Sequence, residues 1–236
     1  MNDSQDSKPR EHRIRSFVMR TGRKTEGQRY ALEHYWPEYG LEFNAQAPYD
    51  FAALFPGAQG VKLEIGFGMG DSLVQMAQQD AQHGYIGIEV HTPGVGHCLA
   101  ALHQAGLQNL RLISHDAIEV LESMIPAASL DAIFLFFPDP WHKQRHHKRR
   151  IVNQSFRDLV FRALKPQGRL HMATDWQDYA RHMARELLSD ERFINLGNEQ
   201  GYSEKPAYRP TTKFEQRGKR LGHGVWDLLF SKSPQV

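Results

Sequence analysis

The segment Leu130–Phe137 most strongly limits the folds open to this chain. Its residues are apolar except for Asp131, and such a run is typical of a strand that is buried on both faces, as in a parallel sheet covered by helices. Pro138 and Pro140 then end the strand, because proline has no N–H to donate to a sheet and restricts the residue before it. We therefore expect a central strand that ends with Asp139 on a stiff, extended exit.

Strand patterns alternate with helix patterns through the middle of the chain. Strands are expected at 61–66, 85–90, 110–113, 130–137 and 169–174, with a late strand at 225–230, and helices from 72, at 94–105, 117–124, 156–164 and 179–188. Ser72 or Asp71 is the expected N-cap of the first of these helices. The alternation predicts an α/β fold with a doubly wound, mostly parallel sheet.

The N-terminal part of the chain has a different character. Residues 1–30 are polar, with eight Lys or Arg against four acids, and we expect a flexible basic arm there. Within it, residues 14–20 include enough apolar side chains to dock on the domain or on a ligand. Residues 31–57 are expected to form an irregular lead-in, and 31–236 to form one domain.

Composition narrows the class of protein. The chain has 236 residues, 40% hydrophobic and 24% charged, which fits a globular domain. No apolar run is long enough for a membrane helix, no signal peptide is expected, and Cys98 is the single cysteine, so we expect a cytoplasmic protein without disulfides. The net charge of +2 does not argue for nucleic-acid binding, so that argument depends on where the charge lies.

Each expected parallel strand has an acidic residue in it or close after it. Because ligands of such sheets bind outside the carboxyl ends of the strands, these acids are candidates for one site: Glu64, Glu89, Asp116, Asp139 and Asp175. A single acid at a strand end is more often structural or merely solvated. Five together are much harder to explain in that way.

A glycine loop at Gly66, Gly68 and Gly70 follows the first strand. A dinucleotide fold needs a later third glycine, and Asp71 at the helix start would repel a phosphate. S-adenosyl-L-methionine (SAM) fits better: Glu89 is placed to accept both ribose hydroxyls and Asp116 the adenine amino group. An NAD(P)-dependent oxidoreductase is the alternative, and the chain lacks its Tyr-x-x-x-Lys motif.

The segment Trp141–Arg150 contains five Lys or Arg and three His. This charge, next to the carboxylate at the strand exit, indicates chemistry on an anionic partner, although a solvated loop is the simpler alternative. His142, His146 and His147 are not expected to bind a metal, because the cations around them would repel it.

The chain resembles the bacterial tRNA (guanine-N7)-methyltransferases. The matching stretches are RSFVMRTGRKTEGQ (15–28), LEIGFGMGDSL (63–73), GIEVH (87–91), DA (116–117), FFPDPWHKQRHHKRR (136–150), TDW (174–176) and TKFEQRG (212–218). The resemblance implies that the cofactor site contains Glu64, Gly66, Gly68, Glu89, Asp116 and Asp139, with Asp139 as the catalytic acid. It implies substrate contacts by Lys143, Asp175, Thr212, Lys213, Phe214 and Glu215, and RNA contacts by Arg145, His146, His147, Lys148, Arg149 and Arg150.

The activity implied is methylation of a variable-loop guanosine of tRNA, without an obligatory protein partner and as a monomer or homodimer. Guanine N7 has an exposed lone pair, so alignment and electrostatics are the main tasks of the enzyme. The division of roles between Asp139, Asp175 and Glu215 stays open. Trp141 or Phe214 would stack on the base, or Trp141 is a core anchor.

A non-enzymatic RNA-binding protein and an adenine amino-methyltransferase are the remaining alternatives. The first would have lost its cofactor acids, and the second needs Asn/Asp-Pro-Pro-Tyr/Phe at the strand exit.

Overall fold

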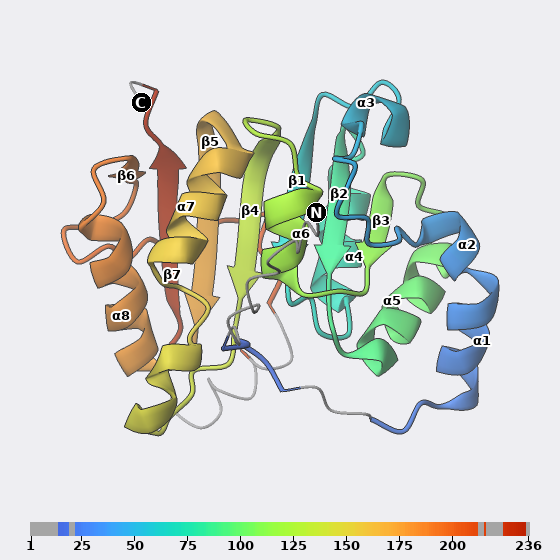
Figure 1. Cartoon of the computed structure of the whole chain (residues 1–236), viewed down its shortest axis with the longest axis horizontal. Helices are drawn as coiled ribbons and strands as arrows, with labels where there is room; N and C mark the ends of the chain where they lie inside the picture. Colours follow the sequence, from blue (N-terminus) through green and yellow to red (C-terminus); the bar gives the residue numbers. More distant parts are fainter. Residues whose placement is uncertain (1–13, 19–21, 212–214, 216–223, 235–236) are drawn as a thin grey trace, which may run out of the picture.

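A seven-stranded sheet forms the centre of the computed structural model, which describes residues 14–18, 22–211, 215 and 224–234 (Figure 1). The strand order is β3-β2-β1-β4-β5-β7-β6. The strands are β1 (Gly60–Ile65), β2 (His83–Ile88), β3 (Leu110–Ile113), β4 (Leu130–Phe136), β5 (Leu164–Thr174), β6 (Phe193–Asn195) and β7 (Trp226–Lys232). All pairings from β3 to β5 are parallel, and β7 pairs antiparallel with β5 and β6. The expected α/β fold with a doubly wound, mostly parallel sheet is confirmed.

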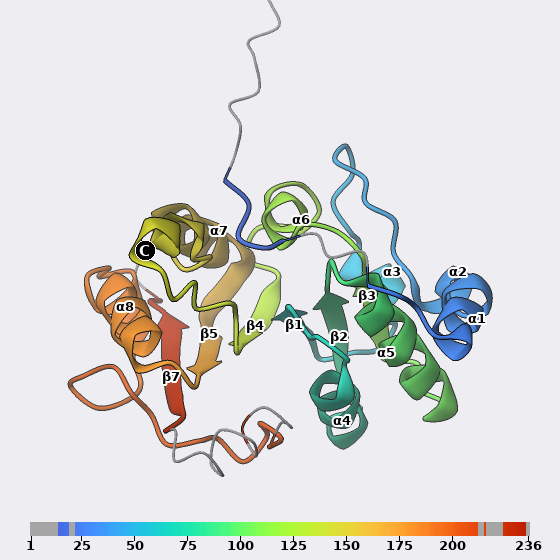
Figure 2. The same cartoon turned by 90° about the horizontal axis from the view of Figure 1, so that it is seen from below.

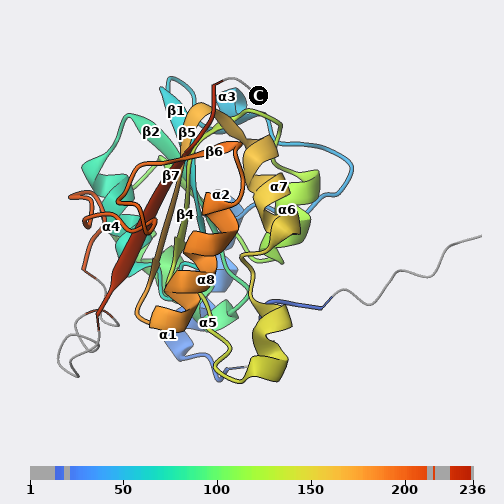
Figure 3. The same cartoon turned by 90° about the vertical axis from the view of Figure 1, so that its left-hand side faces the viewer.

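Helices cover both faces of the sheet, as the views in Figures 2 and 3 show for α4 on one side and α6 and α7 on the other. The helices are α1 (Glu26–His34), α2 (Trp36–Tyr39), α3 (Phe51–Leu54), α4 (Asp71–Gln79), α5 (Thr92–Gln104), α6 (Ala117–Ser123), α7 (Gln154–Ala163) and α8 (Gln177–Leu188), with a 3-10 helix η1 (Gln144–Arg149). One core cluster joins the sheet to α6, α7 and α8, and a second joins it to α1, α4 and α5.

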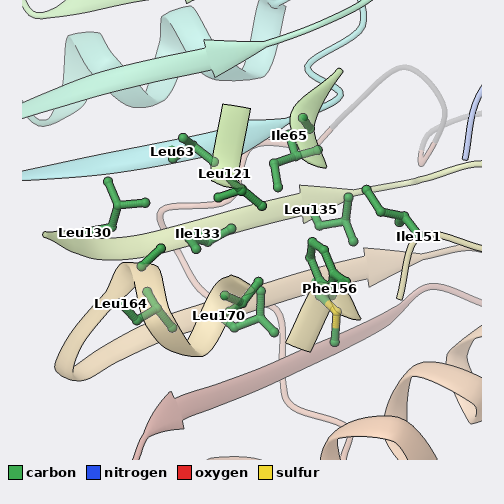
Figure 4. Packing of buried hydrophobic residues seen from close by; sticks show 14 of the residues in the cluster. Leu63, Ile65, Leu121, Leu130, Ile133, Leu135, Ile151, Phe156, Leu164 and Leu170 are labelled. Carbon is green, nitrogen blue, oxygen red and sulfur yellow. The ribbon is translucent and has the colours of Figure 1, made fainter. Parts of the chain in front are cut away.

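Strand β4 has the double burial expected of it. Ile133 and Leu135 belong to the first core cluster, whereas Phe134 and Phe136 belong to the second. Figure 4 shows the first set packed against Phe156 of α7. Because successive side chains of a strand point to opposite faces, a continuous apolar run fills both cores at once.

Some local expectations were wrong. Residues 31–57 are not irregular, since α2, α3 and part of α1 lie there. Helix α1 begins at Glu26 with a capping box between Thr25 and Gln28, so it crosses the expected limit of the arm at residue 30. Helix α4 has Gly70 as its N-cap, in a left-handed conformation and without a side-chain cap. The short strand β6 has no clear pattern in the sequence and was not expected.

Candidate functional site

The carboxyl ends of β1 to β4 surround a cavity of about 220 Å³, which we call the strand-end cavity. Of the predicted residues, its lining includes Gly66, Glu89, Asp116 and Asp139. A second cavity of about 470 Å³, the glycine-loop cavity, lies against the start of α4 and includes Glu64, Gly66 and Gly68 in its lining. Gly66 and Phe137 line both cavities, so the two spaces adjoin. The structure therefore brings all six predicted cofactor residues to one edge of the sheet.

Glu89 is held in place by the backbone. One carboxylate oxygen accepts hydrogen bonds from the N–H groups of Val90 and His91 at 2.7 and 2.9 Å, and the other accepts from Gly68 at 2.9 Å. The bond to Gly68 ties the glycine loop to the end of β2. A carboxylate can accept more than three hydrogen bonds, so Glu89 retains capacity for hydroxyl donors of a ligand.

Glu64 is a buried acid without a full set of partners. Its side chain is only 2% exposed, and Oε2 has no hydrogen-bond partner within the described part of the chain. Burial, and after it the nearby Glu89 carboxylate, raises the pKa of Glu64 to about 8, while a hydrogen bond from Ser72 lowers it by less. A buried carboxyl that lacks a partner is costly unless a ligand completes its environment. A cationic group in the glycine-loop cavity would do so.

The glycine loop is shaped for close approach to a ligand. Gly68 has φ +62°, and a Cβ there would meet nothing within 4 Å, so the loop leaves open space over its backbone. Gly70 has φ +83° and packs against Cys98, which leaves no room for a side chain. Asp71 occupies the first turn of α4, where a phosphate would otherwise bind. The loop therefore favours an uncharged or cationic ligand over a pyrophosphate.

The exit from β4 bends instead of continuing straight. Phe137 has φ +52° and Trp141 φ +51°, left-handed values that are rare for residues other than glycine. The N–H of Phe137 still donates to Ala173 O at 2.7 Å. The left-handed residues lie on either side of Pro138–Pro140, so the extended conformation expected of Asp139 itself stays a prediction. The bend places Phe137 between the cavities and leaves Asp139 exposed at the rim of the strand-end cavity.

Trp141 is an anchor for the N-terminal segment. It is half-buried, and its Nε1 donates to the carbonyl of Ser16 at 3.1 Å. The guanidinium of Arg149 lies 4.9 Å from the ring centroid. Trp141 is in neither core cluster, so the core-anchor interpretation was wrong. The docking of residues 14–18 on the domain is confirmed, and it adds Ser16 and Phe17 to the lining of the strand-end cavity.

The basic segment forms η1 and its flanks at the same edge of the sheet. Lys143, Arg145 and Lys148 are exposed. A further hollow of about 250 Å³ is lined by Lys148, Arg149 and also Arg15, which the motif analysis did not single out as a candidate. Spacing along the sequence gave no signal for Arg15, Ser16 or Phe17 as site residues. Their place depends on the docked arm.

Arg150 does not belong with the exposed cations. It is 4% exposed, and its guanidinium donates to Asp178 at 2.5 Å and to Pro140 O at 3.0 Å, over the ring of Tyr179. These contacts occupy the guanidinium with other protein groups, so the structure does not favour the RNA contact expected of Arg150, although Arg150 lines the same hollow as Lys148 and Arg149. Its role is to tie the basic segment to α8. His146 and His147 are half-buried, and His147 hydrogen-bonds to Arg150.

The predicted substrate residues are only partly described. Asp175 is half-buried directly after β5, near the other strand ends. Thr212, Lys213 and Phe214 lie outside the described residues. Glu215 is 1% exposed and accepts from Arg209 at 2.8 Å and from Lys205 at 3.3 Å. In this conformation Glu215 is an internal ion-pair partner.

Searches for metal and membrane features gave nothing in the ranges that the structure describes. No group of three or more His, Cys, Asp or Glu side chains is placed there to hold a metal ion. No described helix has the length and apolar character that crossing a membrane requires.

Comparison with known proteins identifies the family of the chain. Residues 58–228 match the model of a family described as "Putative methyltransferase". The tRNA (guanine-N(7)-)-methyltransferase of Cronobacter sakazakii is 59% identical over 93% of this chain and 92% of its own length, and that of Yersinia enterocolitica is 58% identical over the same shares. An rRNA methylase from Streptococcus thermophilus has the same fold, with a TM-score of 0.52 at 12% identity over 77% of this chain and 91% of that one. The chain belongs to the tRNA (guanine-N(7)-)-methyltransferase family.

Proposed function

We propose that this protein transfers a methyl group from SAM to N7 of a guanosine in the variable loop of tRNA. The observation that carries the proposal is the pair of adjoining cavities with carboxylates at the ends of four neighbouring parallel strands. The names of its relatives, at 57–59% identity, support guanine N7 and tRNA as target and substrate.

The residues of the two cavities fit SAM. Glu89, fixed by three backbone N–H groups, would accept the ribose hydroxyls, and Asp116, the N-cap of α6, lies where it would accept from the adenine amino group. Glu64, with its unpartnered oxygen, would receive the ammonium. The open backbone at Gly66 and Gly68 leaves room for the methionine chain. When bound, SAM supplies an electrophilic methyl group on its sulfonium.

The protein's own task is to orient the guanine and to stabilise charge. Guanine N7 needs no deprotonation, whereas N1–H and the N2 amino group need acceptors, and the base gains positive charge on methylation. Asp139 is the proposed catalytic residue, because it is exposed at the rim of the cavity and would accept from the base or offset that charge. Asp175 is the second candidate acceptor at this edge.

The exposed cations beside the site would hold the RNA backbone. Lys143, Arg145 and Lys148 are exposed in the basic segment, and Lys148 and the half-buried Arg149 line a hollow with Arg15 of the arm. Phosphate contacts of this kind position the RNA and do not read its sequence. We propose that one methyltransferase domain follows a basic N-terminal arm, and that the arm ends before helix α1 instead of at residue 30. The enzyme works in the cytoplasm on tRNA, as a monomer or homodimer without an obligatory partner.

The test is methyl transfer from labelled SAM to an unmodified tRNA transcript, followed by nucleoside analysis. The expected product is 7-methylguanosine in the variable loop. A transcript in which that guanosine is replaced by adenosine is the control and should take up no label. Label in another nucleoside, or label in the control transcript, would contradict the proposed target.

A further inference from the structure

Arg209 is the most enclosed cation among the described residues that is not part of the cofactor site. Its side chain is 2% exposed. Nε and Nη2 donate to the two oxygens of Asp227 at 2.6 and 2.9 Å, and Nη1 donates to Glu215 at 2.8 Å. A two-pronged contact of this kind fixes the direction of the guanidinium as well as its distance. Arg209 thus joins the segment before β7 to β7 itself.

A second set of hydrogen bonds supports Asp227 from the sheet. His171 of β5 bonds through Nε2 to Asp227 at 2.8 Å and through Nδ1 to the hydroxyl of Tyr208 at 2.9 Å. Burial lowers the pKa of His171, which keeps the ring neutral at pH 7. Burial raises the pKa of Asp227, but the hydrogen bonds from His171 and Arg209 outweigh it, so the net shift is downward. An ionised Asp227 accepts from Nε2–H, and Nδ1 then accepts from Tyr208.

This network reaches the reaction site at two points. Pro210 and Thr211, directly after Arg209, line the glycine-loop cavity opposite the start of α4. The guanidinium also lies 5.7 Å from the ring centroid of Phe137, the residue that lines both cavities. Lys205 bonds to Thr211 at 2.6 Å and to Glu215 at 3.3 Å. In Figure 2 the orange chain that leads to β7 crosses the sheet on the side of α4.

We propose that Arg209 is a positioning residue for the methyl-transfer reaction: through Asp227 and Glu215 it holds Pro210 and Thr211 as the outer wall of the glycine-loop cavity. The proposal rests on the proposed function and deepens it. Among the described residues, Arg209 and its two carboxylate partners are all buried, whereas Lys205 lies nearer the surface. Arg209 therefore acts on the reaction through the wall that it holds, without touching the cofactor or the base. Glu215 has the same role.

The test compares Arg209→Gln, Arg209→Lys and Tyr208→Phe with the wild-type enzyme. Steady-state methyl transfer gives kcat and KM for tRNA, calorimetry gives the Kd of SAM, and thermal unfolding reports stability. Because small displacements in a site can cost about a hundredfold in rate, we expect Arg209→Gln to lower kcat/KM for tRNA about tenfold to a hundredfold. The Kd of SAM should rise by a smaller factor than kcat/KM falls, since Pro210 and Thr211 line the cavity but no cofactor acid contacts Arg209. Arg209→Lys keeps the charge but loses the two-pronged contact. Its kcat/KM should therefore lie between those of the wild-type enzyme and Arg209→Gln.

Arg157→Gln is the matched control. Arg157 of α7 is also mostly buried and pairs with Asp190 and Glu186, at the end of α8 away from the site. The Arg157→Gln variant should have a lower melting temperature than the wild-type enzyme and an unchanged kcat/KM. An Arg209→Gln variant that is folded and has the wild-type kcat/KM would overturn the proposal, and so would a loss of SAM affinity equal to the loss of turnover. If Arg209→Gln does not fold, Arg209→Lys and Tyr208→Phe decide by the same criteria. Absence of activity in the wild-type enzyme would instead reject the proposed function.

Discussion

Binding of SAM should release a proton from Glu64, and this makes its affinity depend on pH. The pKa of Glu64 is raised to about 8 by burial and by Glu89, so at pH 7 about nine-tenths of the free protein carries a neutral Glu64. The ammonium of SAM requires the ionised form. The proton must therefore leave when the ligand binds, and the cost grows as the pH falls below 8.

The size of the pH dependence of SAM binding follows from the raised pKa of Glu64. At pH 6 the carboxyl lies two units below its pKa, so ionising it costs about 2.7 kcal/mol. The contribution of Glu64 to the Kd of SAM should therefore fall about 50-fold between pH 6 and pH 8, provided that the ion pair keeps Glu64 ionised throughout. In calorimetry with buffers of different ionisation enthalpy, close to one proton should be released per SAM at pH 7.

Glu64→Gln is the control, because it keeps the shape of the side chain and cannot titrate. The ammonium of SAM titrates in the same region, with a pKa of about 8, and the ratio of wild-type to variant affinity removes this contribution. A wild-type Kd that does not vary between pH 6 and pH 8, or proton release equal in the two proteins, would refute the reasoning.

The same group affects stability in the absence of SAM. The folded-state pKa of about 8 lies above the ordinary value of 4.5, so the folded state holds the proton longer and stability falls as the pH rises from 4.5 to 8. By pH 7 the loss is about 3 kcal/mol. Glu64→Gln should therefore flatten this part of the profile in denaturant unfolding. An equally steep loss of stability in the variant would assign the effect to another group.

Four further changes test other parts of the site. Asp139→Ala should lower methyl transfer about a hundredfold or more with an unchanged circular dichroism spectrum, and wild-type turnover would remove Asp139 from the mechanism. Arg149→Gln should make the slope of log K against log salt for tRNA binding shallower by about one. Arg150→Gln should instead lower the melting temperature and leave that slope unchanged, because its guanidinium is buried and pairs with Asp178; a shallower slope would show a phosphate contact. Phe17→Ala should raise the Kd of SAM about tenfold by opening the wall of the strand-end cavity, whereas an unchanged Kd would show that the docked arm does not cover the cofactor.

The sequence was sufficient for the sheet and for the edge where the site lies. The apolar run of β4 and the alternation of strand and helix patterns are local properties with a fixed period, so they can be read without coordinates. The carboxyl ends of parallel strands meet at one edge, which is why acids as far apart as Glu64 and Asp139 could be assigned to one site. Their convergence is confirmed by the lining of two adjoining cavities.

The roles of individual charges were decided only by the tertiary structure. Arg149 and Arg150 are neighbours in a basic run and line the same hollow, yet Arg149 lies over Trp141 whereas Arg150 is buried and pairs with Asp178 of α8. A pattern of charges does not reveal which side chain meets a partner that lies 28 residues away along the chain, as Asp178 does for Arg150.

The position of the N-terminal arm was likewise decided only by the tertiary structure. Its contact with Trp141 spans 125 residues of sequence, and no local pattern encodes such a meeting. The sequence by itself determined the fold class, the site edge and the chemistry of its acids, because these follow from periodicity and residue type. Only the packed structure decided that one oxygen of Glu64 lacks a partner among the described residues, that Arg150 is buried and that Arg209 pairs with Asp227 and Glu215. Burial and partner choice depend on contacts between segments that are distant in the chain.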